Sequence, residues 1–231
     1  MKRFYAKVET APAEGGFAIM LDGRVAKTKA KRPLTLPNAA LADAVAQEWR
    51  TQADQIRPDT LPFTRFAATA IDMVAERRDD VVWEIANYAA TDLVCYRAAA
   101  PADLARRQRE GWQPLLDWLA EHHGARLRAT TGVVPIAQRD DALAVLYALV
   151  ADFDDHALVA LHALATACGS LVIALALADG RIDAETAWDL SQIDERYKIE
   201  KWGEDAEATQ ARAAVAADFH AAARFLKLSR S

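Results

Sequence analysis

Cysteine is scarce in this sequence, which contains only Cys95 and Cys168 among its 231 residues. The two are far apart, and neither lies in a Cys-x-x-Cys motif, so the sequence predicts neither a disulfide framework nor a zinc ribbon. A reducing compartment fits this cysteine usage best.

Phosphate-binding and metal-binding motifs are also absent. No Gly-x-x-x-x-Gly-Lys-[Ser/Thr] loop occurs, and no Gly-x-Gly-x-x-Gly follows a predicted strand. His156 and His162 are six residues apart, a spacing that does not place two metal ligands on one helix face, and no His-Glu-x-x-His is present. The sequence therefore predicts no metal site and no cofactor.

Two further features could be taken for catalytic groups. Cys168-Gly169-Ser170 is expected to lie inside an apolar helix, where small residues serve packing, rather than on a strand-to-helix elbow. Pairs of carboxylates open or close predicted helices and are explained by capping; they are Asp79-Asp80, Asp140-Asp141 and Asp154-Asp155. We expect that the chain is not an enzyme.

An excess of positive charge is lacking, because 28 Lys and Arg against 33 Asp and Glu give a net charge of −5. A general nucleic-acid-binding protein would carry a basic footprint, so we expect no nucleic-acid partner. One local basic cluster does occur, Lys27, Lys29, Lys31 and Arg32. It is more typical of a solvated edge strand that lysines keep from pairing than of a binding patch.

Segments typical of targeting are lacking as well. The first residues pass directly into strand-like alternation without an apolar signal core, which predicts a cytoplasmic protein. Residues 157–178 carry no charge apart from His162 and are long enough to span a membrane. Alanine dominates this segment and its flanks are acidic, so the sequence favours a buried central helix over membrane insertion.

The composition that remains is that of a globular protein, 52% hydrophobic and 26% charged. Residues 3–36 predict β-structure that begins with the alternation of Phe4, Ala6 and Val8 and turns at Asp22-Gly23. Asn38 predicts the N-cap of a helix that runs to about Ala53.

Two prolines, Pro58 and Pro62, then interrupt regular helix, and we place a domain boundary there. The predicted domains are residues 1–60, rich in β-hairpins with one helix, and residues 61–231, a helical bundle. The predicted fold class is α+β. Helices are expected over residues 64–77, 79–95, 104–122, 140–152, 157–178, 183–202 and 204–226, and an apolar stripe in the last of them contains Ala208, Ala211, Val215, Phe219, Ala222 and Leu226.

Charge and aromatic residues concentrate in residues 190–207. Leu190, Ile193 and Tyr197 fall on one apolar stripe, and Gly203 is expected to end the helix. In one interpretation the charges form solvated pairs, Asp194 with Lys198 and Arg196 with Glu200. In the other, an acidic rim around Trp202 grips another protein, and its members are Asp194, Glu195, Glu200, Glu204, Asp205 and Glu207. Spacing alone does not decide between them.

Ordered motifs run along nearly the whole chain. They include Gly16-Phe-Ala-Ile-Met-Leu-Asp-Gly-Arg24, Pro33-Leu-Thr-Leu-Pro37, Glu48-Trp49, Pro62-Phe-Thr-Arg65, Thr91-Asp-Leu-Val-Cys-Tyr-Arg97, Arg107-Gln108, Gly169-Ser170-Leu171, Asp194-Glu195 and Trp202-Gly203. This series resembles the ATP synthase assembly chaperone family, Atp-twelve type.

The resemblance implies a small N-terminal β-containing domain joined to a larger helical one. It implies a chaperone without ATPase activity whose client is the free alpha subunit of the ATP synthase catalytic sector, shielded until it pairs with beta. It also implies that Asp194 and Glu195 matter for activity. Because mitochondrial members carry a presequence, its absence here predicts a bacterial cytoplasmic member, and we expect a monomer.

The leading hypothesis is therefore an alpha-subunit holdase, in which Trp202 contacts the client and Asp194, Glu195, Glu200 and Glu204 set its orientation. Two alternatives remain open. One is a small-molecule enzyme with carboxylates in an interdomain cleft, and the other is an adaptor for a different protein client.

Overall fold

The computed structural model describes residues 1–132 and 134–230. The chain divides into two units, one made of Met1–Arg78, Asp154–Ala160 and Ala221–Ser231, the other of Asp79–Phe153 and Leu161–His220. The first change of unit follows Arg78, and the first unit also takes in two later segments. The division into domains 1–60 and 61–231 concerns independent folding and stays a prediction.

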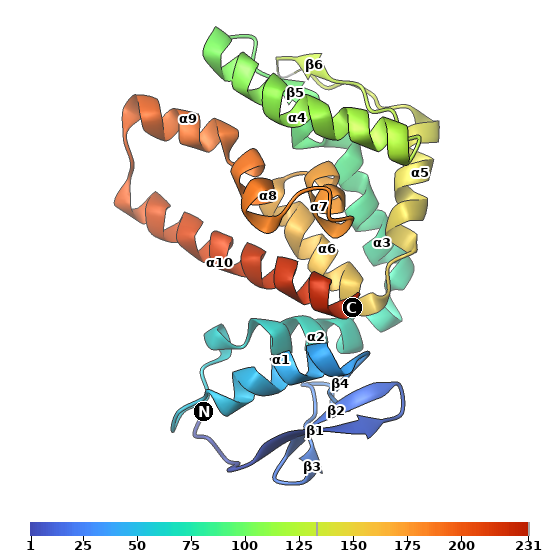
Figure 1. The fold of residues 1–231 in the computed structure, drawn as a ribbon, viewed down its shortest axis with the longest axis vertical. Helices are drawn as coiled ribbons and strands as arrows, with labels where there is room; N and C mark the ends of the chain where they lie inside the picture. The colour runs from blue at the N-terminus through green and yellow to red at the C-terminus, as the bar shows by residue number, and fades with distance from the viewer. Residues whose placement is uncertain (133, 231) are drawn as a thin grey trace. The chain divides into compact units, whose positions relative to one another are not determined.

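The first unit holds a small antiparallel sheet with β2 (Gly16–Leu21) at its centre (Figure 1). β2 pairs along its whole length with β1 (Val8–Ala13), and on its other edge with β3 (Arg24–Val25) and β4 (Thr35–Leu36). Asp22 and Gly23 form the turn between β2 and β3 with positive φ angles of 47° and 76°. The hairpin predicted from Asp22-Gly23 is confirmed.

The prediction that Phe4 and Ala6 belong to the first strand was wrong. β1 begins at Val8, and Phe4 is 62% exposed. The reason is the Asp22 carboxylate, which accepts hydrogen bonds from the backbone N–H groups of Ala6 and Lys7. These donors are therefore satisfied by a side chain instead of by a neighbouring strand.

Helix α1 (Ala39–Arg50) covers the sheet and begins at the predicted cap, where Asn38 Oδ1 accepts from Leu41 N at 2.8 Å. It ends three residues before the expected Ala53. A short turn, η1 (Pro58–Thr60), leads to α2 (Pro62–Asp72) and η2 (Val74–Glu76). The Glu48 carboxylate holds the start of α2 by accepting from Phe63 N at 2.6 Å and Thr64 N at 2.8 Å.

Helices make up most of the second unit, and the predicted α+β fold with a small strand region and a larger helical part is confirmed. In chain order its elements are α3 (Arg78–Asn87), η3 (Tyr88–Thr91), η4 (Leu93–Cys95), β5 (Tyr96–Arg97), α4 (Ala102–His122), β6 (Thr130–Thr131), α5 (Asp140–Ala151), α6 (Asp155–Cys168), α7 (Leu171–Ala178), α8 (Ala184–Ser191), α9 (Ile193–Trp202) and α10 (Ala206–Ser229). Helix α3 begins at Arg78, the last residue of the first unit's first segment, and α6 and α10 each contribute residues to both units.

The apolar run of residues 157–178 is not one helix, as predicted, but two. Gly169 has a φ of +62° and separates α6 from α7, and Ser170 caps α7 by accepting from Ile173 N. Cys168-Gly169-Ser170 therefore lies at a helix break and not inside a helix. Residues 171–176 are all buried and form the core of the second unit. Within the described part of the chain, no helix is both long enough and apolar enough to cross a membrane.

Four other predicted helices also differ from the structure, and the one expected over residues 64–77 ends at Asp72 and is followed by η2. The helix expected over residues 79–95 ends at Asn87 and continues as η3 and η4, and that expected over residues 183–202 is divided at Gln192 into α8 and α9. In α10, the predicted stripe is buried only from Phe219 onward. Ala208 and Ala211 are exposed and Val215 is 44% exposed, so the first half of this stripe is not part of the core.

Asp92 is a fully buried carboxylate at the centre of the second unit. Its Oδ1 accepts from Val94 N at 3.1 Å and its Oδ2 accepts from Val172 N at 3.0 Å, which ties η4 to the start of α7. Burial raises the pKa of Asp92 to about 6, although the N–H donors oppose this rise.

We predict that Asp92 makes the stability of the protein depend on pH. Because the folded-state pKa lies above the ordinary value of 3.8, the folded state binds the proton more tightly than the unfolded chain. The contribution of Asp92 is therefore most favourable below pH ~4 and declines as the pH rises through ~6, by about 2 to 3 kcal/mol in total.

Urea unfolding of the wild type and of Asp92→Asn between pH 4 and pH 7.5 tests this prediction. The difference between the two free energies of unfolding should change with pH in the expected direction. The exposed Asp117→Asn should show no such change relative to wild type, and a pH-independent difference for Asp92→Asn would contradict the prediction.

Candidate functional site

Helices α8 and α9 lie against α4 at a point where α4 carries a glycine. A Cβ atom at Gly111 would lie 2.8 Å from Leu190 Cδ2 and 2.9 Å from Ile193 Cδ1, so a larger residue would displace one of these side chains. Next to it, the buried Trp112 donates from Nε1 to the backbone oxygen of Leu190 at 2.8 Å. This contact fixes the junction of α8 and α9.

Nearer the start of α4, Tyr197 fixes the body of α9. Its side chain is buried, and its hydroxyl donates to Asp103 Oδ1 at 2.8 Å. The cations of Arg107 and Lys201 lie over its ring, 5.4 Å and 5.1 Å from the centroid. Helix α9 is therefore held against α4 at both ends of the contact.

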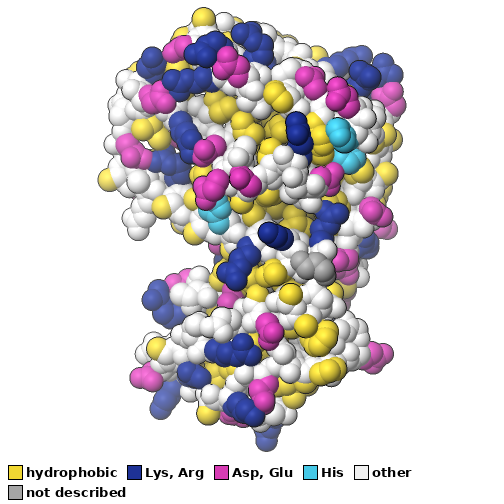
Figure 2. Space-filling view, in the orientation of Figure 1, with side chains coloured by type: hydrophobic (Ala, Val, Ile, Leu, Met, Phe, Trp, Pro, Cys, Tyr) yellow, Lys and Arg dark blue, Asp and Glu magenta, His cyan; other side chains and the backbone are white. Residues whose placement is uncertain are grey.

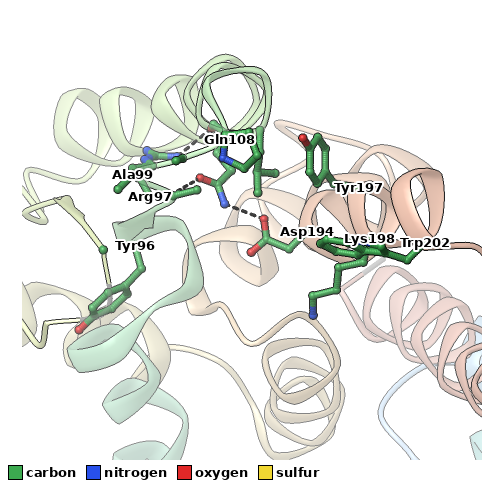
Figure 3. A pocket seen from close by; sticks show the side chains of 13 residues that line it. Tyr96, Arg97, Ala99, Gln108, Asp194, Tyr197, Lys198 and Trp202 are labelled. Carbon is green, nitrogen blue, oxygen red and sulfur yellow. Dashed lines mark hydrogen bonds between the residues drawn. The ribbon is translucent and has the colours of Figure 1, made fainter.

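Between these two contacts, the buried Gln108 connects α4, β5 and α9 (Figure 3). Its Oε1 accepts from Ala98 N at 2.6 Å, so its Nε2 must be the atom that faces Asp194, and it donates to Asp194 Oδ1 at 2.6 Å. The position of the Asp194 carboxylate is therefore fixed, and one of its oxygens accepts a hydrogen bond from Gln108.

Arg97 completes this polar group from β5. Its Nη1 donates to the backbone oxygen of Gln108 at 2.8 Å, and its guanidinium lies 5.2 Å from the centroid of the Trp112 ring. Its Nη2 is buried without a hydrogen-bond partner among the described residues. Burial lowers the pKa of Arg97 from its ordinary value.

A groove of about 480 Å³ opens beside this group, entirely within the second unit (Figure 3). Small and apolar residues of the β5–α4 connection form much of its lining, and α9 supplies the other side. Trp202 belongs to the lining although it is 78% exposed. The lining residues are Tyr96, Arg97, Ala98, Ala99, Ala100, Pro101, Leu104, Gln108, Gly132, Asp194, Tyr197, Lys198 and Trp202, and we call them the Asp194 groove.

The ion pairs predicted along α9 were wrong. Lys198 pairs with Glu195 at 3.4 Å and not with Asp194, and Glu200 pairs with Arg107 of α4 at 2.8 Å. The hydrogen bond from Arg107 holds the pKa of Glu200 below its usual range. Arg196 instead pairs with Asp189 of α8.

Sequence and structure comparisons identify the family. The family model described as ATP12 chaperone protein matches residues 2–120, more than half of the chain. The chain belongs to the ATP12 chaperone family. This confirms the resemblance that the ordered motifs indicated.

Known ATP12 proteins share both the sequence and the fold. The crystal structure of Atp12 from Paracoccus denitrificans is 46% identical, with a TM-score of 0.95, and the match covers 99% of this chain and 98% of that one. A point mutant of P. denitrificans Atp12p matches over the same shares at 45% identity and a TM-score of 0.95. The protein "atp12, mitochondrial" of Schizosaccharomyces pombe is 23% identical over 214 residues, 87% of this chain and 74% of that protein.

The structure of this ATP12-family chain separates the residues that the sequence grouped as one acidic rim. Asp194 and Trp202 line the same groove. The other acidic residues do not line it. Glu195 and Glu204 both pair with Arg212, Glu195 at 3.8 Å, and Glu200 pairs with Arg107. Asp205 caps α10 by accepting from Glu207 N and Ala208 N, and Glu207 is exposed in the first turn of α10.

Sequence reasoning missed the side of the groove that β5 and α4 form. Gln108 was present in the Arg107-Gln108 motif, but no local pattern linked it to Asp194, 86 residues away. Across the described ranges, no group of three or more His, Cys, Asp or Glu residues could hold a metal ion. The chaperone family agrees with the expectation of a non-enzyme.

We predict that Gln108→Glu destabilises the protein far more than the same change at Gln113. The new carboxylate would lie against the carboxylate of Asp194 where a donor now stands, and we expect a loss of about 1 to 3 kcal/mol in the free energy of unfolding. Gln113→Glu is a matched control, because Gln113 is exposed and donates to Asp117 at 2.8 Å. Equal urea midpoints for the two variants at pH 7.5 would show that the Gln108 contact does not stabilise α9.

Proposed function

We propose that this ATP12-family chain is an ATP-independent holdase for the free alpha subunit of the F-type ATP synthase catalytic sector. It binds the subunit in the bacterial cytoplasm, acts as a monomer and prevents aggregation until beta arrives. An unassembled subunit exposes an apolar interface that would otherwise aggregate. The observation that carries the proposal is a preformed, largely apolar groove with one unpaired carboxylate.

The groove suits an extended segment of polypeptide. Small side chains, Ala98 to Ala100, leave room for a client side chain between β5 and α9, and Pro101 and Leu104 extend the apolar surface. Burying such surface contributes roughly 25 cal/mol per Å² before the costs of ordering the client. The groove would therefore supply affinity without selecting one sequence.

Asp194 would supply selectivity. Gln108 occupies one of its oxygens, and the carboxylate has no cation partner in the part of the chain that the structure describes. An apolar client segment with an Arg or Lys side chain beside it would pair with this carboxylate, whereas an acidic segment would be repelled. We propose that this pairing distinguishes alpha from other unfolded chains.

The other acidic residues would form a polar rim rather than the binding core. Glu195, Glu200 and Glu204 are already paired with cations, so each would have to exchange a partner to contact a client. Trp202, Asp205 and Glu207 are exposed near the end of α9 and the start of α10, although Asp205 Oδ1 already caps α10. We propose that Trp202 provides the main aromatic contact, because exposed tryptophan is enriched where proteins bind one another.

We predict that purified protein suppresses the light scattering of alpha subunit diluted from denaturant, at one chaperone per subunit and without ATP. Release by competition with beta needs no nucleotide, so adding ATP should not change the result. Suppression of alpha but not of beta would support a selective holdase. Absence of suppression, or equal suppression of unrelated proteins, would contradict the proposed client.

We further predict that Asp194→Asn weakens this protection while leaving the fold intact. Asparagine keeps an oxygen for the Gln108 donor but removes the charge, and we expect about tenfold more chaperone to be needed for half-maximal suppression. The thermal midpoint should stay within ~2 °C of wild type, because the charge lies at the groove surface. The matched control is Asp189→Asn, which removes an exposed charge of α8 that does not line the groove. Equal protection by both variants would exclude Asp194 from client binding.

A further inference from the structure

A second groove, of about 640 Å³, lies in the first unit. Its lining comes from the segment before β1, from the β2–β3 hairpin and from α1, and it consists of Phe4, Tyr5, Leu21, Asp22, Arg24, Val25, Ala26, Lys27 and Trp49. We call it the Phe4 groove. None of these residues belongs to the Asp194 groove.

Three aromatic rings form one wall of the Phe4 groove. Phe4 and Tyr5 meet edge to face with centroids 5.4 Å apart, and Tyr5 and Trp49 meet in the same way at 5.6 Å. The Tyr5 hydroxyl donates to the backbone oxygen of Trp49 at 2.7 Å. Phe4 is 62% exposed and Val25 39% exposed, so the groove presents apolar surface to solvent.

The exposure of Phe4 is not that of a frayed chain end. The residue before it is anchored, because Arg3 N donates to Asp54 O at 2.8 Å and Arg3 Nη1 donates to Gln52 O at 2.8 Å. Tyr5, after it, is buried. Phe4 is thus held at the surface by ordered backbone on both sides, which is how an aromatic contact residue is presented to a partner.

Two cations and one carboxylate line the Phe4 groove. Its one carboxylate, Asp22, is used by the N–H groups of Ala6 and Lys7, and these bonds lower its pKa. The side chains of Arg24 and Lys27 are exposed and have neither an ion-pair nor a hydrogen-bond partner within residues 1–132 and 134–230. A ligand that carries carboxylates would therefore find two free cations beside an apolar wall.

We propose that the Phe4 groove is a second polypeptide-binding site, and that it takes an acidic segment with aromatic or aliphatic side chains. The apolar side chains of the ligand would pack on Phe4, Val25 and Trp49, and its carboxylates would pair with Arg24 and Lys27. This charge preference is opposite to that of the Asp194 groove. The proposal goes beyond holdase activity at the Asp194 groove and stands whatever the client there is.

A polypeptide fits this groove better than a nucleic acid. Aromatic rings beside cations also occur in single-strand nucleic-acid sites, but those sites follow the phosphate backbone with a continuous positive groove. Here only two cations are unopposed, and the net charge of the chain is −5. On the face that Figure 2 presents, acidic and basic side chains are interspersed rather than gathered into a basic stripe.

The direct test is fluorescence anisotropy with labelled peptides and the intact chain. The probe is a twelve-residue fluorescein peptide that alternates Glu with Leu and Phe. Two companion peptides replace every Glu by Lys, or every Leu and Phe by Ser. The first probe should bind, and its affinity should fall as salt rises because the ion pairs are exposed. The two companions should bind about tenfold more weakly or not at all, since one lacks the carboxylates and the other lacks the apolar side chains.

Matched charge reversals locate the site. Arg24→Glu combined with Lys27→Glu should weaken binding of the acidic probe by about tenfold, whereas Lys2→Glu combined with Lys29→Glu, which changes net charge equally outside the groove, should leave it unchanged. Phe4→Ala should weaken binding without altering the salt dependence. Circular dichroism and thermal unfolding verify that each variant is folded.

Two results would overturn the proposal. One is unchanged binding of the acidic probe to the Arg24→Glu, Lys27→Glu variant. The other is tighter binding of a twelve-nucleotide oligothymidine than of the acidic probe, with displacement of that probe, which would assign the Phe4 groove to nucleic acid. Neither result would affect the Asp194 groove, because the comparison of Asp194→Asn with wild type in the alpha-subunit scattering assay reports on that site separately.

Discussion

The side-chain amide of Gln108 has only one possible orientation, and the shape of the Asp194 groove depends on this constraint. Its oxygen is occupied by the Ala98 N–H, so its nitrogen faces Asp194. One buried side chain therefore fixes the end of β5, the position of α9 and the donor on the carboxylate. Gly111, Trp112 and Tyr197 hold α9 close enough for this bond to form. A polar network buried this fully is costly unless every member is satisfied, and Arg97 Nη2 is the member that is not.

Charge around α9 contributes little to stability, and we propose that it serves selectivity instead. Most charged residues around α9 lie in exposed pairs, such as Glu200 with Arg107, and such pairs contribute little to folding. Asp194 in one groove, and Arg24 and Lys27 in the other, have no counter-ion in the described chain and face apolar surface. A holdase needs apolar surface to bind an unassembled subunit, and unpaired charge lets it bind other chains more weakly. Each groove combines apolar surface with unpaired charge, which is negative in the Asp194 groove and positive in the Phe4 groove.

Local signals in the sequence predicted local structure well. Asn38 caps α1, Asp22-Gly23 turns the hairpin, and Gly203 ends α9, because each depends on one residue's own hydrogen bonds or φ angle. The breaks at Gly169 and Gln192 were missed. After Gly169, the backbone N–H groups at the start of α7 donate to the side chains of Ser170 and of the distant Asp92. At Gln192, no Gly or Pro marks the end of a helix.

The site itself was only half predictable. The motif resemblance directed attention to Asp194, and Trp202, which was predicted to act beside it, lines the same groove. The ion pairs predicted along α9 assumed that residues four apart on one helix bind each other. In the structure Lys198 has a partner within α9, Glu195, but the partners of Glu200 and Asp194 come from α4: Arg107 lies 93 residues from Glu200, and Gln108 lies 86 residues from Asp194. Periodicity within one helix carries no information about such partners, and only the packing of α9 on α4 selects them.

Hydrogen–deuterium exchange of the chain with and without unfolded alpha subunit would show whether the client lies in the Asp194 groove. A client bound in the Asp194 groove should protect backbone amides on both sides of it, in residues 96–104 and in residues 193–202, and this protection should be lost in Asp194→Asn. Binding of alpha with unchanged exchange in both segments would contradict the account, because the client would then be held by another surface.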